Sequence, residues 1–142
     1  MSINYSKIKI GIIDLDTTHA RSFSNILTKS DKAVISGIFD RGRIRGNEES
    51  LSFSKDYGAE FYSNTEELCK HVDAVMVLSA DWMTHAADIE KVIRAGLPCL
   101  CDKPIAGSTE DLKKIRKVVN ETGTPFLGGS GWRWNSKVKE LS

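Results

Sequence analysis

Apolar runs recur along the chain, separated by polar segments about as long as a short helix. We predict β-strands over the apolar runs at 7–14, 33–40, 60–62, 73–79, 98–101 and 125–129. The run DAVMVLS at 73–79 is almost continuously apolar, which is typical of a strand that is covered on both faces.

The segments between these strands carry the spacing or the start signals of helices. We predict helices over 19–29, around 47–57, over 64–69 from an Asn64 cap, up to Gly96, and over 108–123 from a Ser108 cap. The apolar residues that share a helical face are Ala20, Phe23, Ile26 and Leu27 in the first helix, Met83, Ala86, Ile89 and Ile93 before Gly96, and Leu112, Ile115 and Val119 in the last. This alternation predicts an α/β fold, a doubly wound parallel sheet with helices on both faces.

Composition narrows the class of protein without pointing to a function. A chain of 142 residues has the length of a single domain. Its net charge of +1 gives no electrostatic reason to expect binding to nucleic acid or to an anionic membrane. No apolar run reaches the roughly 18 residues of a membrane span, and MSINYSKIK lacks the apolar core of an export signal. Three cysteines fit a reducing compartment, so we expect a cytoplasmic protein.

Polar residues gather where the predicted strands end. In a parallel sheet these carboxyl ends meet at one edge, where ligands bind near the point at which strand order reverses. The candidate binding residues are Gly11, Asp14, Asp16, Thr17, Thr18, His19, Asp40, Arg41, Ser79, Asp81, His85, Lys103 and Arg133.

The stretch IGIIDLDTTHARS, residues 10–22, has the outline of a dinucleotide-binding turn without its glycines. The three positions of the G-x-G-x-x-G pattern read Asp14, Asp16 and His19. A carboxylate about 4 Å from a phosphate repels it by roughly 4 kcal/mol at an effective dielectric constant near 20. Thr17, Thr18 and a protonated His19 offer donors in compensation. We therefore expect dinucleotide binding that is weakened, or lost.

The segment LSADWMTHAADIEKVIRAGLPCLCDKP resembles the Gfo/Idh/MocA oxidoreductases. That family carries H-x-x-x-I and then A-G-x-x-x-x-x-[ED]-K-P, and the matching residues here are His85, Ile89, Ala95, Gly96, Asp102, Lys103 and Pro104. The resemblance implies a Rossmann-like dinucleotide-binding domain over 1–130, NAD or NADP as the cofactor, and a sugar or other polyol-like substrate. GWRWNSKVKEL is similar to the family's exit into a second domain, so 131–142, with a helix starting at 136–141, is expected to begin that connection.

The same resemblance implies individual roles. Lys103 would lie near the nicotinamide and hydrogen-bond the reacting hydroxyl, and His85 would approach the ribose or the substrate. Asp40 would accept hydrogen bonds from the adenosine ribose and favour NAD, whereas Arg41 and Arg43 would receive a 2′-phosphate. Asp81 and Trp82 would touch the nicotinamide side, and Arg133 would border the site. Each residue also has an ordinary structural alternative: a surface lysine, a packed histidine, strand-end or helix caps, and a stacked interdomain arginine.

Other hypotheses remain open from the sequence. The family's substrate domain is absent from this chain, so we expect no turnover alone, and a homo-oligomer or a partner chain could supply the missing part. The altered turn also suits a non-catalytic Rossmann-type binding or regulatory module. IIDLDTT further resembles the first motif of haloacid dehalogenase-like Mg²⁺ phosphohydrolases, with Asp14 as the nucleophile. Cys99 and Cys101 share one strand face, which alone is weak evidence for a metal.

Overall fold

The computed structural model of this protein describes residues 6–140, and strands alternate with helices throughout it. The strands are β1 (Ile8–Ile13), β2 (Ala33–Phe39), β3 (Glu60–Phe61), β4 (Ala74–Val77), β5 (Cys99–Cys101) and β6 (Phe126–Gly128). The helices are α1 (Thr18–Thr28), α2 (Gly46–Tyr57), α3 (Thr65–Cys69), α4 (His85–Arg94), α5 (Thr109–Thr122), the 3₁₀ turn η1 (Gly131–Trp134) and α6 (Ser136–Lys139). Each predicted element is present, with ends that differ by a few residues. The helix predicted at 136–141 spans Ser136–Lys139, Glu140 lies in a turn, and 141 lies outside the described residues.

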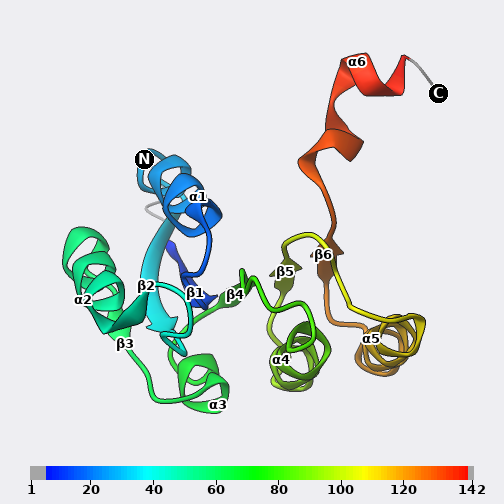
Figure 1. Ribbon diagram of the computed structural model, residues 1–142, viewed down its shortest axis with the longest axis horizontal. Coiled ribbons are helices and arrows are strands. Elements are labelled where there is room, and N and C mark those ends of the chain that lie inside the picture. Colours follow the sequence, from blue (N-terminus) through cyan, green and yellow to red (C-terminus); the bar gives the residue numbers. More distant parts are fainter. Residues whose placement is uncertain (1–5, 141–142) are drawn as a thin grey trace.

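The strands form one parallel sheet in the order β3-β2-β1-β4-β5-β6. Strands β2 and β3 lie on one side of β1, and β4, β5 and β6 lie on the other. The strand order therefore reverses between β1 and β4. Helices α1 and α2 cover one face, and α3, α4 and α5 cover the other (Figure 1). This is the predicted Rossmann-like fold. The β1/β4 junction is its expected ligand edge.

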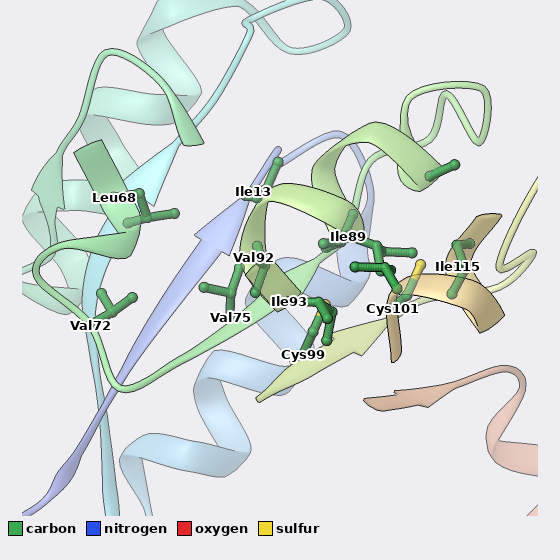
Figure 2. Packing of buried hydrophobic residues seen from close by; sticks show 13 residues of the cluster. Ile13, Leu68, Val72, Val75, Ile89, Val92, Ile93, Cys99, Cys101 and Ile115 are labelled. Carbon is green, nitrogen blue, oxygen red and sulfur yellow. The ribbon is translucent and has the colours of Figure 1, made fainter. Parts of the chain in front are cut away.

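Side-chain alternation along the strands supplies both cores. Ile12 faces the α1–α2 layer, and Ile13 faces the α3–α5 layer; both are fully buried. Figure 2 shows the second cluster, in which Ile89 and Ile93 of α4 pack toward the sheet beside Val75. Two buried faces explain why the central strands are apolar at nearly every position.

Local signals predict the helix ends better than they predict the buried faces. Asn64 and Ser108 cap α3 and α5, accepting hydrogen bonds from the amides of Glu67 (2.8 Å) and Asp111 (3.1 Å). Three inward-facing predictions are wrong. Met83 precedes α4 and is 62% exposed, and Ile26 and Leu112 are 67% and 45% exposed. Ile26 and Leu112 lie at the border of an apolar stripe, where a small rotation of the helix decides burial, whereas Met83 lies outside the helix.

The α1–α2 face of the sheet is less completely covered toward β6. Leu127 of β6 is 49% exposed, and the chain then leaves the sheet through η1 and α6 (Figure 1). Trp132, which lies in η1, is 69% exposed. Among the described residues, no helix is long and apolar enough to cross a membrane.

Candidate functional site

The turn between β1 and α1 has the backbone shape that a glycine usually provides. Asp14 has a φ of +62°, which makes it the one non-glycine residue of the described chain in the left-handed region. Asp is among the residues that tolerate this conformation best. Thr17 then caps α1, with its side chain accepting a hydrogen bond from the amide of His19 (3.2 Å). The tight bend is therefore kept although its glycine is replaced.

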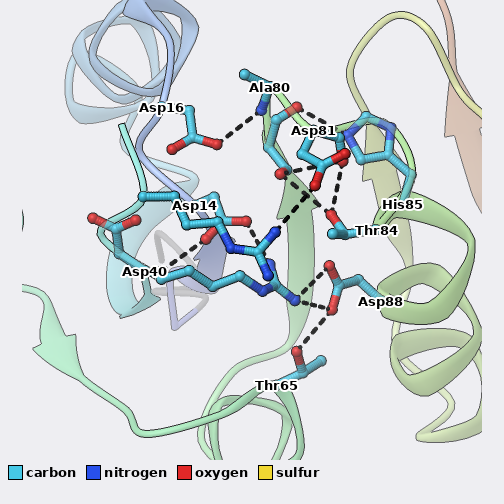
Figure 3. Close-up of polar contacts among 12 residues, drawn as sticks. Asp14, Asp16, Asp40, Thr65, Ala80, Asp81, Thr84, His85 and Asp88 are labelled. Atoms are coloured by element: carbon cyan, nitrogen blue, oxygen red, sulfur yellow. Dashed lines mark hydrogen bonds and ion pairs between the residues drawn. The ribbon is translucent and has the colours of Figure 1, made fainter. Parts of the chain in front are cut away.

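The Asp14 carboxylate is buried and faces an arginine rather than the open edge of the sheet. Arg41 donates to it from its backbone amide (2.9 Å) and from Nη1. The Nη2 of Arg41 reaches both carboxylate oxygens of Asp88 in α4 (2.8 and 2.9 Å), and Thr65 donates to the same carboxylate at 3.2 Å (Figure 3). Burial opposes the charge of Arg41, but the hydrogen bonds and charges of Asp88 and Asp14 outweigh it and raise its pKa. Arg41 is thus committed to an internal network.

The Asp16 side chain connects the end of β1 to the end of β4, the two strands between which the strand order reverses. It accepts a hydrogen bond from the amide of Ala80, just beyond β4, at 2.9 Å (Figure 3). Burial raises the pKa of Asp16, and the charges of Asp14 and Asp40 add to this effect against the Ala80 hydrogen bond. Arg45, which sequence reasoning missed, donates from Nε to the backbone carbonyl of Asp16 at 3.0 Å.

Asp40 is turned into the loop that follows β2. One carboxylate oxygen accepts from the amide of Gly42 (3.1 Å) and more distantly from that of Leu15 (3.5 Å), and the other accepts from the Ser50 hydroxyl. The residue is 8% exposed. These contacts match its structural alternative, a strand-end aspartate that caps the next loop, and they leave little of the carboxylate free for a ribose.

His19 reaches across the edge of the sheet to the end of β5. Its Nδ1 lies 2.5 Å from Oδ2 of Asp102, a residue 83 positions away in the sequence. The other carboxylate oxygen of Asp102 accepts the amide of Lys103 at 2.7 Å. The Lys103 side chain is exposed at this edge. The structure therefore joins the β1–α1 turn to the residue for which the family resemblance implies a catalytic role.

His85 is placed differently from the expectation that it approaches a ribose or a substrate. It is fully buried at the start of α4, with Nε2 2.9 Å from the carbonyl of Ser79 and Nδ1 2.9 Å from that of Pro104. A neutral ring can donate to one of these carbonyls and a protonated ring to both. Either way, His85 connects the ends of β4 and β5 and presents no ring nitrogen to a ligand.

Of the remaining candidate residues, Ser79 and Asp81 follow β4 at the edge of the sheet, and Gly11 lies inside β1. Ser79 is buried beside Asp16, and Asp81 accepts from the amide of Met83 (3.2 Å) and from Arg43 in a half-exposed ion pair of 3.0 Å. Gly11 lies within β1, where a Cβ would meet Leu68 at 3.1 Å, so it serves helix packing rather than ligand contact.

Arg133 and the cysteines lie apart from the turn. Arg133 is exposed in η1, beyond β6. Cys99 and Cys101 are both buried on one face of β5, and burial raises the pKa of Cys101 to about 12. Within residues 6–140, no group of three or more His, Cys, Asp or Glu side chains is arranged to hold a metal ion.

The edge offers donors that fit a diphosphate. The amide groups of Asp16, Thr17 and Thr18 make no hydrogen bond to any other described residue, and they stand at the positive end of α1. Both turn carboxylates are bound by internal donors instead of facing these amides. The donor set is therefore compatible with a dinucleotide, although two acidic side chains remain nearby.

Comparison with known proteins agrees with this arrangement. The profile of the Gfo/Idh/MocA family, described as an oxidoreductase family with an NAD-binding Rossmann fold, matches residues 8–129. The chain belongs to this family. It contains the family's NAD-binding domain, which implies a nicotinamide dinucleotide as the cofactor.

Its relatives include inositol dehydrogenases. The inositol 2-dehydrogenase of Cereibacter sphaeroides is 30% identical over 120 residues, which are 82% of this chain and 34% of that protein. The inositol 2-dehydrogenase 2 of Saccharopolyspora erythraea is 30% identical over 129 residues, 89% of this chain and 35% of that protein. The chain thus spans about a third of the length of the curated relatives it matches.

Solved structures support the fold. The apo scyllo-inositol dehydrogenase of Lactobacillus casei superposes with a TM-score of 0.82 at 22% identity, covering 98% of this chain and 41% of that one. A dehydrogenase from Clostridium difficile gives 0.80 at 23% identity, covering 96% of this chain and 43% of that one.

Several partners at the site were not predicted from the sequence. Asp88, Arg45 and Ala80 were not expected there, although Asp88 carried a signal as a charged residue beside the apolar stripe of α4. The contact of Arg45 and the amide of Ala80 had no sequence signal, because both depend on how loops from different strands meet.

Proposed function

We propose that this chain is the dinucleotide-binding part of an NAD(P)-dependent oxidoreductase that acts on a sugar or other polyol-like substrate. The observation that carries the proposal is the pairing of the two turn carboxylates with internal donors, Asp14 with Arg41 and Asp16 with Ala80, beside three free amides of the α1 turn. When bound, the nicotinamide would accept or donate the hydride. Lys103, exposed at the same edge, would contact the reacting hydroxyl.

Binding is proposed to be weaker than in a glycine-rich turn. The repulsion of about 4 kcal/mol expected for a carboxylate facing a phosphate is an upper bound, because neither carboxylate points at the free amides. The charges of Asp14 and Asp16 nevertheless lie close to the diphosphate path. Of the two arginines suggested for a 2′-phosphate, Arg43 is exposed and Arg41 is not free.

Other parts of the enzyme are proposed to lie outside this domain. The inositol dehydrogenase relatives are about three times as long as the matched region. We therefore propose that 131–142 begins the connection to a further domain. That domain, or a partner chain, would supply most substrate contacts.

Titration with NADH and NADPH tests the proposal. We expect quenching of tryptophan fluorescence with a Kd in the range of about 10 µM to 1 mM. Asp16→Asn removes one charge while its amide oxygen can still accept from Ala80, and it should tighten binding by roughly tenfold. Asp31→Asn, with the same charge change at an exposed site, is the matched control and should leave the Kd unchanged. No binding by either protein would favour the non-catalytic module instead.

The phosphohydrolase hypothesis finds no support in the geometry. Its nucleophile, Asp14, is 1% exposed and bound to Arg41, so the carboxylate has no open approach for a phosphate ester.

A further inference from the structure

The turn that carries Lys103 is held from both faces of the sheet. On the α1 side, Nδ1 of His19 contacts the Asp102 carboxylate at 2.5 Å. On the α4 side, Nδ1 of His85 lies 2.9 Å from the carbonyl of Pro104. The residues on either side of Lys103 are therefore anchored, while the lysine side chain itself is exposed.

The contact with His19 uses a carboxylate that is already fixed. The amide of Asp102 donates to the carbonyl of Val77 at 3.0 Å, and its Oδ1 accepts the amide of Lys103 at 2.7 Å. Only Oδ2 remains, and His19 occupies it. The Asp102 side chain is 10% exposed, so water competes poorly for this oxygen. The result is a short series of hydrogen bonds from α1 to the backbone of Lys103.

The imidazole ring is itself oriented. Phe23, one turn further along α1, lies with its ring centroid 5.4 Å from that of His19. Since His19 stands at the first turn of α1, its backbone moves with the three free amides of Asp16, Thr17 and Thr18. A ligand that orders those amides would therefore also act on the histidine.

We propose that His19 is a positioning residue that fixes Lys103 through Asp102 and couples it to the β1–α1 turn. The inference rests on the proposed function, in which the turn receives the diphosphate and Lys103 faces the reacting hydroxyl. An ångström of misplacement at a reacting group can cost on the order of a hundredfold in rate, so such an anchor has a catalytic purpose. Where glycine-rich turns leave this position without a side chain, this chain uses a histidine to connect the two halves of the edge.

Nuclear magnetic resonance of the Lys103 side chain tests the coupling. Reductive methylation with ¹³C-formaldehyde labels the lysines, and a Lys103→Arg variant assigns the signal. ADP serves as the probe, because it carries the diphosphate without the nicotinamide. In the native protein ADP should shift the Lys103 signal, and in His19→Ala the shift should fall by at least about fivefold at saturating ADP.

Two further variants separate positioning from general stability. His19→Asn places an amide nitrogen near the position of Nδ1 and should restore the ADP-induced shift. His71→Ala, in which an exposed histidine stacked on Tyr62 is removed, is the matched control and should respond as the native protein does. A full response in His19→Ala would overturn the proposal, as would a lost response in His71→Ala.

A second measurement keeps the test independent of dinucleotide binding. Without any ligand, exchange of the Lys103 amide hydrogen should be about tenfold faster in His19→Ala than in the native protein. If ADP does not bind the native protein, the proposed function fails, and this exchange rate alone decides the positioning role. An unchanged rate would refute it.

Discussion

Arg41 provides the sharpest test of how this site is assembled. In Arg41→Leu the side-chain volume is largely kept and the charge is lost. The carboxylates of Asp14 and Asp88, both 2% exposed, then remain inside the protein without a cation. The expected consequence is a large loss of stability, because these groups cannot recover their hydration without opening the fold.

The magnitude follows from the burial of the network. Removing one partner of a buried ion pair typically costs about 3–5 kcal/mol. Because the Arg41 side chain is itself 20% exposed, solvent screens the network in part, so we take the lower end, about 3 kcal/mol. For a domain of this size that corresponds to a fall in Tm of roughly 10 °C.

Urea unfolding followed by circular dichroism measures this loss as a free energy. Arg21→Leu is the matched control, because Arg21 also binds two carboxylates, at 2.7 and 2.8 Å, but its partners Glu49 and Asp56 are reached by water. A cost no larger than that of Arg21→Leu at pH 7 would refute the reasoning.

Three other outcomes are expected. Burial raises the pKa of Asp16 above its usual 3.8, so its ionisation opposes folding; Asp16→Asn should raise the Tm at pH 7, and the gain should vanish as the pH falls below about 4. In Gly37→Ala the new Cβ would lie 2.7 Å from Leu68 and 2.9 Å from Tyr62, so urea unfolding should show a loss of about 1–3 kcal/mol. Burial raises the thiol pKa values, to about 11 for Cys69 and about 12 for Cys101. A thiol reagent at pH 8 should therefore react slowly with the native protein, whereas after unfolding it should react readily with all three cysteines.

Local patterns in the sequence were sufficient for the order of elements and most of their ends. The caps at Asn64 and Ser108, and the apolar strand at 73–79, act through neighbours a few residues away, so they can be read without the fold. The same reading predicted the ligand edge, because parallel strands bring their carboxyl ends together whatever their order. The motif around Lys103 likewise identified the family before any contact was known.

The partners of the charged residues were decided only by the tertiary structure. Whether Arg41 faces a cofactor phosphate or Asp14 and Asp88 depends on β2 lying beside β1 and on Asp88 of α4 reaching the end of β2. The pairing of His19 with Asp102 likewise needs α1 and β5, 83 residues apart, to meet at one edge. A side chain's local sequence determines its type and its reach. The strand order and register determine what lies within that reach, and in a buried edge the nearest opposite charge then decides its orientation.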